Sequence, residues 1–307
     1  MLRAAQTAGA LALPLPGSGR TLERWLALAE LSAADLVLGR LAEAHVDALA
    51  ILAELDSAAL AGSGQLWGVW AAEPPTGRVR ADPTESGWVL TGQKAWCSGA
   101  LLLDRALVTA HVEDAQRLFA VEVRHVVPVP GSWAAVGMAA SGSVSVELAA
   151  SPAVAVGGPG DYLDRPGFWH GGAGVAACWY GGALGAARAL LAAARTALLD
   201  PHALAHLGAV DALVSGLAAH LAVAAAEVDA DPRGPSAQLR AVRLRARVEA
   251  GATEVLDRVG RALGAGPVCL DPVQARRAAD LPVYLRQSHA ERDLAGLGRL
   301  AVEQATW

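Results

Sequence analysis

The spacing of apolar residues changes twice along the chain, and this change constrains the fold more than any other feature. From Thr21 to about Leu60, apolar residues recur mostly three or four positions apart, which predicts two amphipathic helices. Ser32-Ala-Ala-Asp35 has the form of a capping box with Asp in place of Glu, and we expect it to separate the two helices. Between Leu66 and about Val156 the helical spacing disappears, and from Gly171 onward it returns.

The middle stretch consists of short segments of aromatic and branched residues separated by Gly, Pro, Asp and Ser, which favours several strands in a small barrel or sandwich. The segments with the strand pattern are 66–70, 87–91, 105–110, 117–123 and 143–148. Three alanine-rich helical segments follow, at 171–194, 203–228 and 236–263. We therefore divide the chain into a helical region at 1–62, a β domain at 63–160 and a helical bundle at 161–307.

Composition narrows the class of protein. More than half of the 307 residues are apolar, so the chain can bury a large core. No uninterrupted apolar run reaches the roughly 18 residues that span a bilayer, so we expect no membrane span and a cytoplasmic location. The net charge of −5 argues against nucleic-acid binding. Four arginines between Arg240 and Arg247 cannot share one helix face, which favours a solvated helix surface.

The cysteines give no sign of a metal site or a disulfide framework. Cys97, Cys178 and Cys269 lie far apart and form no Cys-x-x-Cys pair. We expect each of them to be a small buried side chain, and we expect no metal in this protein.

One segment resembles a known family. Trp88-Val-Leu-Thr-Gly-Gln-Lys-Ala-Trp-Cys-Ser-Gly-Ala100 is similar to a stretch of the acyl-CoA dehydrogenase superfamily in which a strand and turn lead to Lys-x-Trp-Ile-Thr/Ser-Asn-Gly. In that family the Trp and the hydroxyl residue lie against the flavin ring, with the hydroxyl near the reactive ring nitrogen. The resemblance implies that Trp96 packs on the flavin, that Ser98 hydrogen-bonds it and that Cys97 lies in the same cofactor-binding stretch.

An upstream stretch extends the resemblance. Val69-Trp-Ala-Ala-Glu-Pro74 is similar to the family strand that ends in Thr-Glu-Pro, whose backbone meets the pyrimidine edge of the flavin. This implies that Trp70, Ala71 and Ala72 bind the cofactor through their backbone. Ala72 occupies the Thr position, so one side-chain contact is lost. The family then has Gly-Ser-Asp where this chain has Thr76-Gly-Arg78, which implies an altered substrate side of the pocket.

The C-terminal part carries weaker matches. Gly181-Gly-Ala-Leu-Gly185 looks like the start of the first C-terminal helix, and Arg277-Ala-Ala-Asp280 is similar to the Arg-Asp pair before the last helices. Ala262-Leu-Gly-Ala-Gly266 resembles a Gly-Gly-x-Gly turn that approaches the cofactor pyrophosphate from a neighbouring subunit. Gly264 and Gly266 are therefore implied to bind the cofactor, because a backbone without Cβ can approach phosphate oxygens.

The resemblance implies an α+β, acyl-CoA dehydrogenase-like fold, with N-terminal helices, a central β-barrel and a C-terminal helical bundle. It also implies FAD as cofactor, acyl-CoA or another acyl thioester as substrate, and a homodimer or homotetramer that completes the cofactor site. The N-terminal region is shorter than in the family.

Two departures concern the catalytic base. The usual Glu stands eight residues after the Asp of the Arg-Asp pair, which here is Ser288, and the alternative position falls near Val175. Neither is a carboxylate. His289 or Glu291 could replace the base, because His289 and Asp293 share a face if they lie on a helix. A structural histidine at a polar helix start is the simpler explanation of this pattern.

Two further features bear on the cofactor and the pocket. The Arg-x-x-Phe-Gly that normally follows the first long C-terminal helix is missing after Arg195. His170, in a segment rich in glycine and aromatic residues, is a second catalytic candidate that suits a pocket wall, and a packed loop is its simpler explanation.

Three functions remain open at this point. The first is an FAD-dependent oxidoreductase that acts on an acyl thioester. The second is a monooxygenase-type relative that uses reduced flavin and oxygen and therefore needs no base for an α-proton. The third is a non-catalytic partner subunit that kept the fold and lost the site.

Overall fold

The computed structural model describes residues 1–73, 78–196 and 198–304. Contacts divide the chain into two compact units. The first contains Met1–Leu13, Leu41–Ala135 and Ala139–Phe168, and the second contains Pro14–Arg40, Val136–Met138 and Trp169–Trp307. The division predicted at residues 62 and 160 follows the change of secondary structure, which is a different criterion, so those boundaries stay a prediction.

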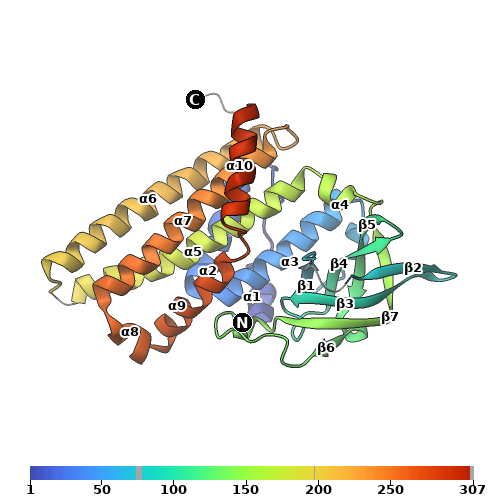
Figure 1. The fold of residues 1–307 in the computed structure, drawn as a ribbon, viewed down its shortest axis with the longest axis horizontal. Coiled ribbons are helices and arrows are strands. Elements are labelled where there is room, and N and C mark those ends of the chain that lie inside the picture. The colour runs from blue at the N-terminus through green and yellow to red at the C-terminus, as the bar shows by residue number, and fades with distance from the viewer. Residues whose placement is uncertain (74–77, 197, 305–307) are drawn as a thin grey trace. The chain divides into compact units, whose positions relative to one another are not determined.

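The first unit is built on a seven-stranded sheet (Figure 1). Its strands are β1 (Trp67–Trp70), β2 (Arg80–Thr84), β3 (Gly87–Cys97), β4 (Arg105–Val112), β5 (Ala115–Glu122), β6 (Val127–Val129) and β7 (Val144–Val156). Pairing runs from β4 through β2, β3, β7 and β5 and returns to β4, so these five strands close into a barrel. β1 adds to β4 and β6 adds to β7. The sequence left barrel and sandwich open, and closure of the ring identifies the barrel.

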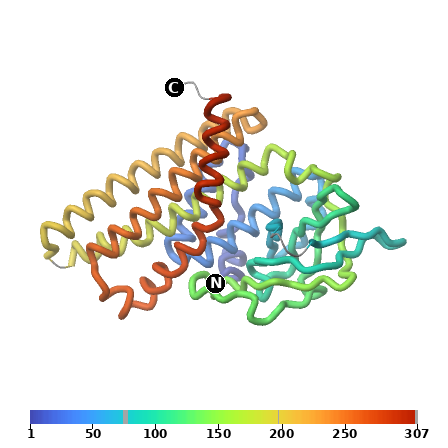
Figure 2. The backbone as a smooth tube through the Cα atoms, in the orientation of Figure 1, coloured from blue at the N-terminus to red at the C-terminus, as the bar shows by residue number. Residues whose placement is uncertain are grey.

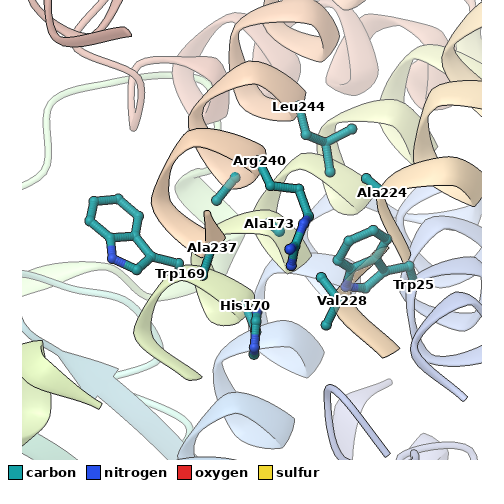
Figure 3. Close-up of a pocket in the computed structure, with 10 residues that line it drawn as sticks. Trp25, Trp169, His170, Ala173, Ala224, Val228, Ala237, Arg240 and Leu244 are labelled. Carbon is teal, nitrogen blue, oxygen red and sulfur yellow. The ribbon is translucent and has the colours of Figure 1, made fainter. Parts of the chain in front are cut away.

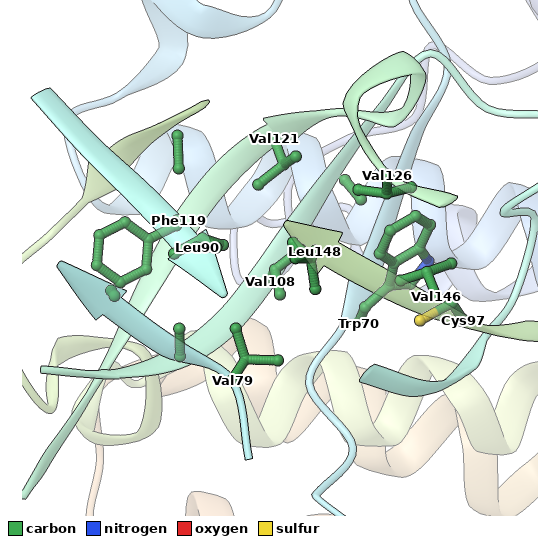
Figure 4. Close-up of a cluster of buried hydrophobic side chains, with 14 of the residues drawn as sticks. Trp70, Val79, Leu90, Cys97, Val108, Phe119, Val121, Val126, Val146 and Leu148 are labelled. Carbon is green, nitrogen blue, oxygen red and sulfur yellow. The ribbon is translucent and has the colours of Figure 1, made fainter. Parts of the chain in front are cut away.

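Two apolar clusters form because strand residues alternate between the two faces of the sheet. Leu90, Val108 and Phe119 belong to one cluster (Figure 4). Their chain neighbours Leu107 and Leu118 belong to the other, together with residues of α3 (Leu36–Glu54). The unit also contains the short helices α1 (Leu2–Thr7), η1 (Ala58–Leu60), η2 (Val123–His125), η3 (Ala139–Ser141) and α4 (Asp161–Asp164).

The second unit is helical (Figure 2). It is made of α2 (Thr21–Ala34), α6 (Pro201–Ala230), α7 (Ala237–Leu263), α8 (Ala265–Leu270), α9 (Pro272–Leu285), α10 (Glu291–Gln304) and most of α5 (Gly167–Thr196). α6 and α7 lie side by side and run antiparallel. α5 approaches α2 so closely that a Cβ on Gly181 would stand 2.2 Å from the carbonyl oxygen of Ala29. The absence of a side chain at Gly181 therefore permits this close packing of the two helices.

The break between α2 and α3 falls where the sequence predicted it, but the capping residue differs. Ser32 is not an N-cap, because it lies inside α2 and its hydroxyl donates to the carbonyl of Leu28. Asp35 caps α3 instead, since its carboxylate accepts the backbone N–H of Leu38 at 2.8 Å. The Ser32–Asp35 motif thus predicted the position of the break correctly, but the carboxylate of Asp35 caps the following helix in place of the Ser32 hydroxyl.

Two helices in the described part of the chain, α5 and α6, are long and apolar enough to cross a membrane by length and composition alone. In α5, 61% of the most apolar window is buried within the chain, as in a core helix. In α6 only 28% of that window is buried. The expectation that no segment spans a membrane stays a prediction.

Candidate functional site

The end of β3 carries the predicted flavin-facing stretch. The pairing of β3 with β7 shifts register between Lys94 and Cys97, which is the mark of a β-bulge. Within it Trp96 has a φ of 56°, in the left-handed region that bulky residues seldom adopt. Its indole is 56% exposed. The bulge thus presents a large aromatic ring to the outside at a backbone cost of about 1–3 kcal/mol.

Ser98, two residues further on, is half-buried and belongs to a row of three hydroxyls. Ser143, at the start of β7, donates its hydroxyl to Oγ of Ser98 at 3.1 Å. Oγ of Ser141, in η3, lies 2.7 Å from Oγ of Ser143. Ser141 and Ser143 are buried, and the carbonyl of Ser141 accepts the N–H of Gly99 at 2.9 Å. The row runs from the interior of the unit to Ser98, and nothing in the sequence pairs these positions.

The side chains of Trp70 and Cys97 belong to the barrel core, next to Val146 (Figure 4). Nε1 of Trp70 donates to the carbonyl of Ser98 at 3.0 Å, so this indole supports the backbone of the segment that follows β3. Burial raises the pKa of the Cys97 thiol to about 12, which makes it unreactive. The buried side chain of Trp70 is compatible with the predicted backbone contact to the cofactor, and the buried side chain of Cys97 is unavailable to a ligand.

Ala71 and Ala72 follow β1 and are half-buried and exposed, respectively, as a backbone contact to a ligand would require. The next residue, Glu73, anchors this segment to the barrel. Its carboxylate lies 3.2 Å from Nε2 of His111 and 3.7 Å from Nζ of Lys94. Thr76 and its neighbour Gly77, which the sequence placed on the substrate side, lie outside the described residues.

Glu73 is held by a charged partner, Lys94, whose side chain is buried although that of Glu73 is not. The Lys94 side chain is only 3% exposed, and its Nζ donates to Oγ1 and the carbonyl of Thr109. Burial lowers the pKa of Lys94, although the charge of Glu73 opposes this shift. Burial also disfavours ionised Glu73, but the hydrogen bond with His111 and the charge of Lys94 outweigh it and lower its pKa. Lys94 in the motif is therefore a structural residue beneath the segment.

The predicted catalytic residues His289 and Glu291 lie in the second unit, at the start of α10. Nδ1 of His289 is 3.4 Å from Oδ1 of Asp293, and the N–H of His289 donates to the same carboxylate at 3.0 Å. The predicted pair of His289 and Asp293 therefore forms, with 65% of the His289 side chain exposed. Glu291 is exposed in the first turn of α10. Ser288, at the usual base position, is buried and bonds to Glu249.

Gly264 lies between α7 and α8, as the predicted turn requires, whereas Gly266 belongs to the first turn of α8. Gly264 ends α7 with a φ of 66°, a conformation that favours glycine. A Cβ on either residue would meet no atom of the described chain within 4 Å. The turn is open, as the approach of another group requires.

The Arg-Asp motif has a structural role here. Arg277 donates to the carbonyl of Ala33 at 2.8 Å, and Asp280 accepts the N–H of Met138. Burial raises the pKa of Asp280. Both residues join segments of the second unit that are distant in sequence.

His170 lines a narrow hollow between α2, α5, α6 and α7 that has no room for a ligand (Figure 3). Its Nε2 donates to the carbonyl of Pro232 at 2.7 Å. Trp25 and Arg240 line the same hollow. The Arg240 side chain is only 9% exposed, so the prediction of a solvated helix face is wrong at this position.

The prediction that each cysteine is buried is wrong for Cys269, which is exposed.

Comparison with protein families finds no match to this sequence, and comparison with curated proteins finds none either. Solved structures do match. TdsC of Paenibacillus sp. A11-2, solved with FMN and indole, has a TM-score of 0.80 and 20% identity over 92% of this chain and 84% of its own. Methanesulfinate monooxygenase MsuC of Pseudomonas fluorescens has a TM-score of 0.82 and 18% identity over 99% and 90% of the two chains. XiaF of Streptomyces sp., solved with FADH2 and glycerol, has a TM-score of 0.76 and 18% identity over 91% and 80%.

The chain has the acyl-CoA dehydrogenase-like fold. The predicted fold class is thereby confirmed, including the order of N-terminal helices, barrel and C-terminal helices. At 18–20% identity these neighbours show the fold alone. Within this fold Trp96 lies in a bulge at the end of β3 and Ser98 directly follows that strand, whereas His289 precedes α10 and Glu291 begins it, both in the other unit.

Proposed function

We propose that this chain is a flavin-dependent monooxygenase that uses reduced flavin and oxygen on an organic substrate. One observation carries the proposal. Trp96 and Ser98 of the family motif are kept, with Trp96 exposed and Ser98 half-buried, while Ser288 and Val175 stand where the dehydrogenases carry a catalytic carboxylate. Removal of an α-proton requires a positioned base, whereas insertion of an oxygen atom does not.

The residues of the first unit fit a flavin. An exposed indole offers an apolar face to a planar ring, and the Ser98 hydroxyl is free to donate because Ser143 donates to it. The backbone of Ala71 and Ala72 is outside regular structure and next to the anchored Glu73. When bound, the reduced flavin would supply two electrons to dioxygen, so that one oxygen atom enters the substrate and the other leaves as water.

The structural neighbours support this reading over the dehydrogenase. TdsC is a dibenzothiophene monooxygenase and MsuC is a methanesulfinate monooxygenase. TdsC was solved with FMN and XiaF with FADH2, so both flavins are accommodated by proteins of this fold. We propose FAD for this chain, because the open turn at Gly264 and Gly266 resembles an element that meets a pyrophosphate, which FMN lacks. The missing Arg-x-x-Phe-Gly leaves FMN as the competing cofactor.

An acyl-thioester oxidoreductase is the second candidate. It is supported by the similarity of the Trp88–Ala100 segment and by the contact between His289 and Asp293, which could hold an imidazole as a base. Its weakness is the exposure of His289, because proton abstraction next to a thioester carbonyl needs a dry pocket with an oriented base.

A direct test begins with flavin binding. The purified chain is mixed with FAD or FMN, and binding is followed by the visible spectrum. The reduced complex is then exposed to oxygen with aromatic, sulfur-containing or amine substrates, and product mass is measured. We expect products heavier by one oxygen atom. Oxidation of an acyl thioester with an artificial electron acceptor, without oxygen insertion, would favour the second candidate. If the chain bound neither flavin, the remaining function would be that of a non-catalytic partner subunit.

We also propose that the chain forms a homodimer or homotetramer in the cytoplasm. The exposed face of α6 supports assembly. Eight exposed residues without a charge recur at three- or four-residue spacing along it: Leu204, Gly208, Ala212, Ser215, Ala219, Val223, Ala226 and Ala230. Small side chains of this kind allow another helix to approach closely. The net charge of −5 supports the proposal that nucleic acid is not a partner.

A further inference from the structure

The side-chain hydroxyls of Ser141, Ser143 and Ser98 form a row of hydrogen bonds that is buried at the Ser141 and Ser143 positions. The three residues come from η3, the segment before β7 and the segment after β3, all within the first unit. Successive oxygens are 2.7 and 3.1 Å apart. Ser141 and Ser143 are 1% and 4% exposed, whereas Ser98 is half-buried. Only the Ser98 end of the row, two residues after the exposed Trp96, is therefore partly open to solvent.

A row of hydroxyls can carry its hydrogen bonds in either direction. Each serine has one hydrogen to donate and lone pairs to accept, and its hydrogen rotates about the C–O bond. In one direction Ser143 donates to Ser98, and Ser98 is left with a hydrogen for an external acceptor. In the other direction Ser98 accepts from an external donor, gives its hydrogen to Ser143, and Ser143 gives its hydrogen to Ser141.

A flavin presents both partners in turn. The ring nitrogen that reacts is an acceptor in oxidised flavin and carries a hydrogen in reduced flavin. A single hydroxyl could meet both forms only if its own hydrogen found another acceptor in the second case. A half-buried hydroxyl left without that acceptor loses binding free energy. Ser143 supplies the acceptor at the required position.

We propose that Ser143 is a positioning residue that lets Ser98 hydrogen-bond both oxidised and reduced flavin, by reversing the direction of the three-serine row. The inference rests on the proposed flavin site. It adds the residue that allows this site to keep a hydrogen bond to the flavin in both redox states. It assigns Ser141 as the hydroxyl that exchanges a hydrogen bond with Ser143. Cooperative polarisation along the row strengthens the bond that Ser98 makes in each direction.

The experiment compares Ser143→Ala with the wild type by measuring the dissociation constants of oxidised flavin, and of reduced flavin under anaerobic conditions. In the variant Ser98 can still donate to oxidised flavin, so we expect a change of less than about threefold. Reduced flavin would leave the Ser98 hydrogen without an acceptor, so we expect about tenfold weaker binding. Because binding and reduction are linked, the potential of the bound flavin should fall in the variant.

Three variants serve as controls. Ser143→Thr keeps the hydroxyl and should restore the wild-type ratio of the two constants. Ser145→Ala removes a hydroxyl from the same strand but outside the row, and should leave both constants unchanged. Ser98→Ala should weaken both flavin forms. Circular dichroism and thermal unfolding of each variant establish that it is folded, and Ser141→Ala, which interrupts the row further inside, should weaken reduced flavin selectively as well.

The outcomes separate the inference from the proposed function. Wild-type protein that binds neither flavin form would overturn both. Wild-type protein that binds flavin, with a Ser143→Ala variant that loses both forms equally or neither, would overturn the reversal and leave the flavin site standing. Selective loss of reduced flavin, restored by Ser143→Thr, supports the inference.

Discussion

At the scale of single residues, Trp96 combines an unfavourable backbone with an exposed ring. A left-handed φ costs a bulky residue free energy, and an indole that is 56% exposed recovers little of it by packing. A conformation of this kind is retained where the ring has another use. Stability and function should therefore separate at this residue.

The replacement Trp96→Gly tests that separation. Glycine tolerates the left-handed conformation, so we expect the free energy of unfolding to change by no more than about 1 kcal/mol. Flavin affinity should fall, because the aromatic face is gone. The matched control is Trp70→Ala, which empties part of the barrel core and should cost about 3–5 kcal/mol. Denaturant unfolding measures both. Equal destabilisation by the two changes would make Trp96 a packing residue.

His45 predicts a dependence of stability on pH. It is buried, and its Nδ1 accepts the N–H of Trp67 at 3.2 Å. Burial lowers its pKa from 6.5 to about 4. The unfolded chain therefore takes up a proton below about pH 6.5 that the folded chain refuses until about pH 4. The contribution of neutral His45 is complete above pH 6.5 and is lost as the pH falls to 4.

We expect this loss to reach about 1–3 kcal/mol. Urea unfolding of the wild type between pH 7 and 4 measures it, and His45→Gln serves as the control, since the amide can still accept a hydrogen bond and does not titrate. The variant should lose less stability over the same range. Parallel curves for the two proteins would place the acid sensitivity in other groups.

The residues of the site divide into those that sequence reasoning reached and those that it missed. The motif located Trp96 and Ser98, because a short contiguous pattern carries them. It did not show that the Cys97 side chain between them points into the core, since the bulge that turns Trp96 outward is a departure from regular alternation. Ser143 was missed because its partner is 45 residues away.

At the scale of elements, the helical period and the strand pattern predicted most segments. β2 and β6 were missed. Each is short and contains a proline, Pro83 or Pro128, which indicates a loop when the sequence is read alone. Both prolines lie in strands because the neighbouring strand supplies pairing on one side. Local composition is therefore insufficient to predict a strand whose formation depends on pairing with residues distant in the sequence.

The start of α2 depends on a residue near the end of α6. Asp229 accepts hydrogen bonds from the N–H groups of Gly19 and Thr21, each at 3.0 Å, and from the hydroxyl of Thr21 at 2.6 Å. This carboxylate satisfies donors that a helix start leaves free, and its negative charge suits that end of the helix. The sequence could not predict a cap from 208 residues away.

We expect Asp229→Ala to lower the free energy of unfolding by about 1–3 kcal/mol, because buried donors are left unpaired. Asp231→Ala is the matched control. Asp231 is exposed, and its loss should change stability by less than about 0.5 kcal/mol. Thermal unfolding followed by circular dichroism measures both. A small effect of Asp229→Ala would mean that water replaces the carboxylate.

At the scale of the whole molecule, the order of helices, strands and helices predicted the fold class, but the grouping of segments differs from their order in the chain. Residues Pro14–Arg40 belong to the C-terminal helical unit. The ion pair of Glu30 with Arg188 and the bond from Arg277 to the carbonyl of Ala33 hold them there. Such grouping depends on contacts between distant residues, which apolar periodicity cannot encode.

The exposed face of α6 leads to a prediction about the oligomeric state of the chain. A helix of 30 residues in which only 28% of the most apolar window is buried needs a cover, and its uncharged small residues suit a second copy of the chain. We expect the wild type to have the mass of a dimer or tetramer in analytical ultracentrifugation. Ala219→Glu places a charge on this face and should shift the mass toward the monomer. Ala250→Glu, an exposed alanine of α7, is the matched control and should keep the wild-type mass. A wild-type monomer that stays in solution without detergent would contradict assembly through α6, and a chain that sediments only with lipid vesicles would indicate that lipid covers the face instead.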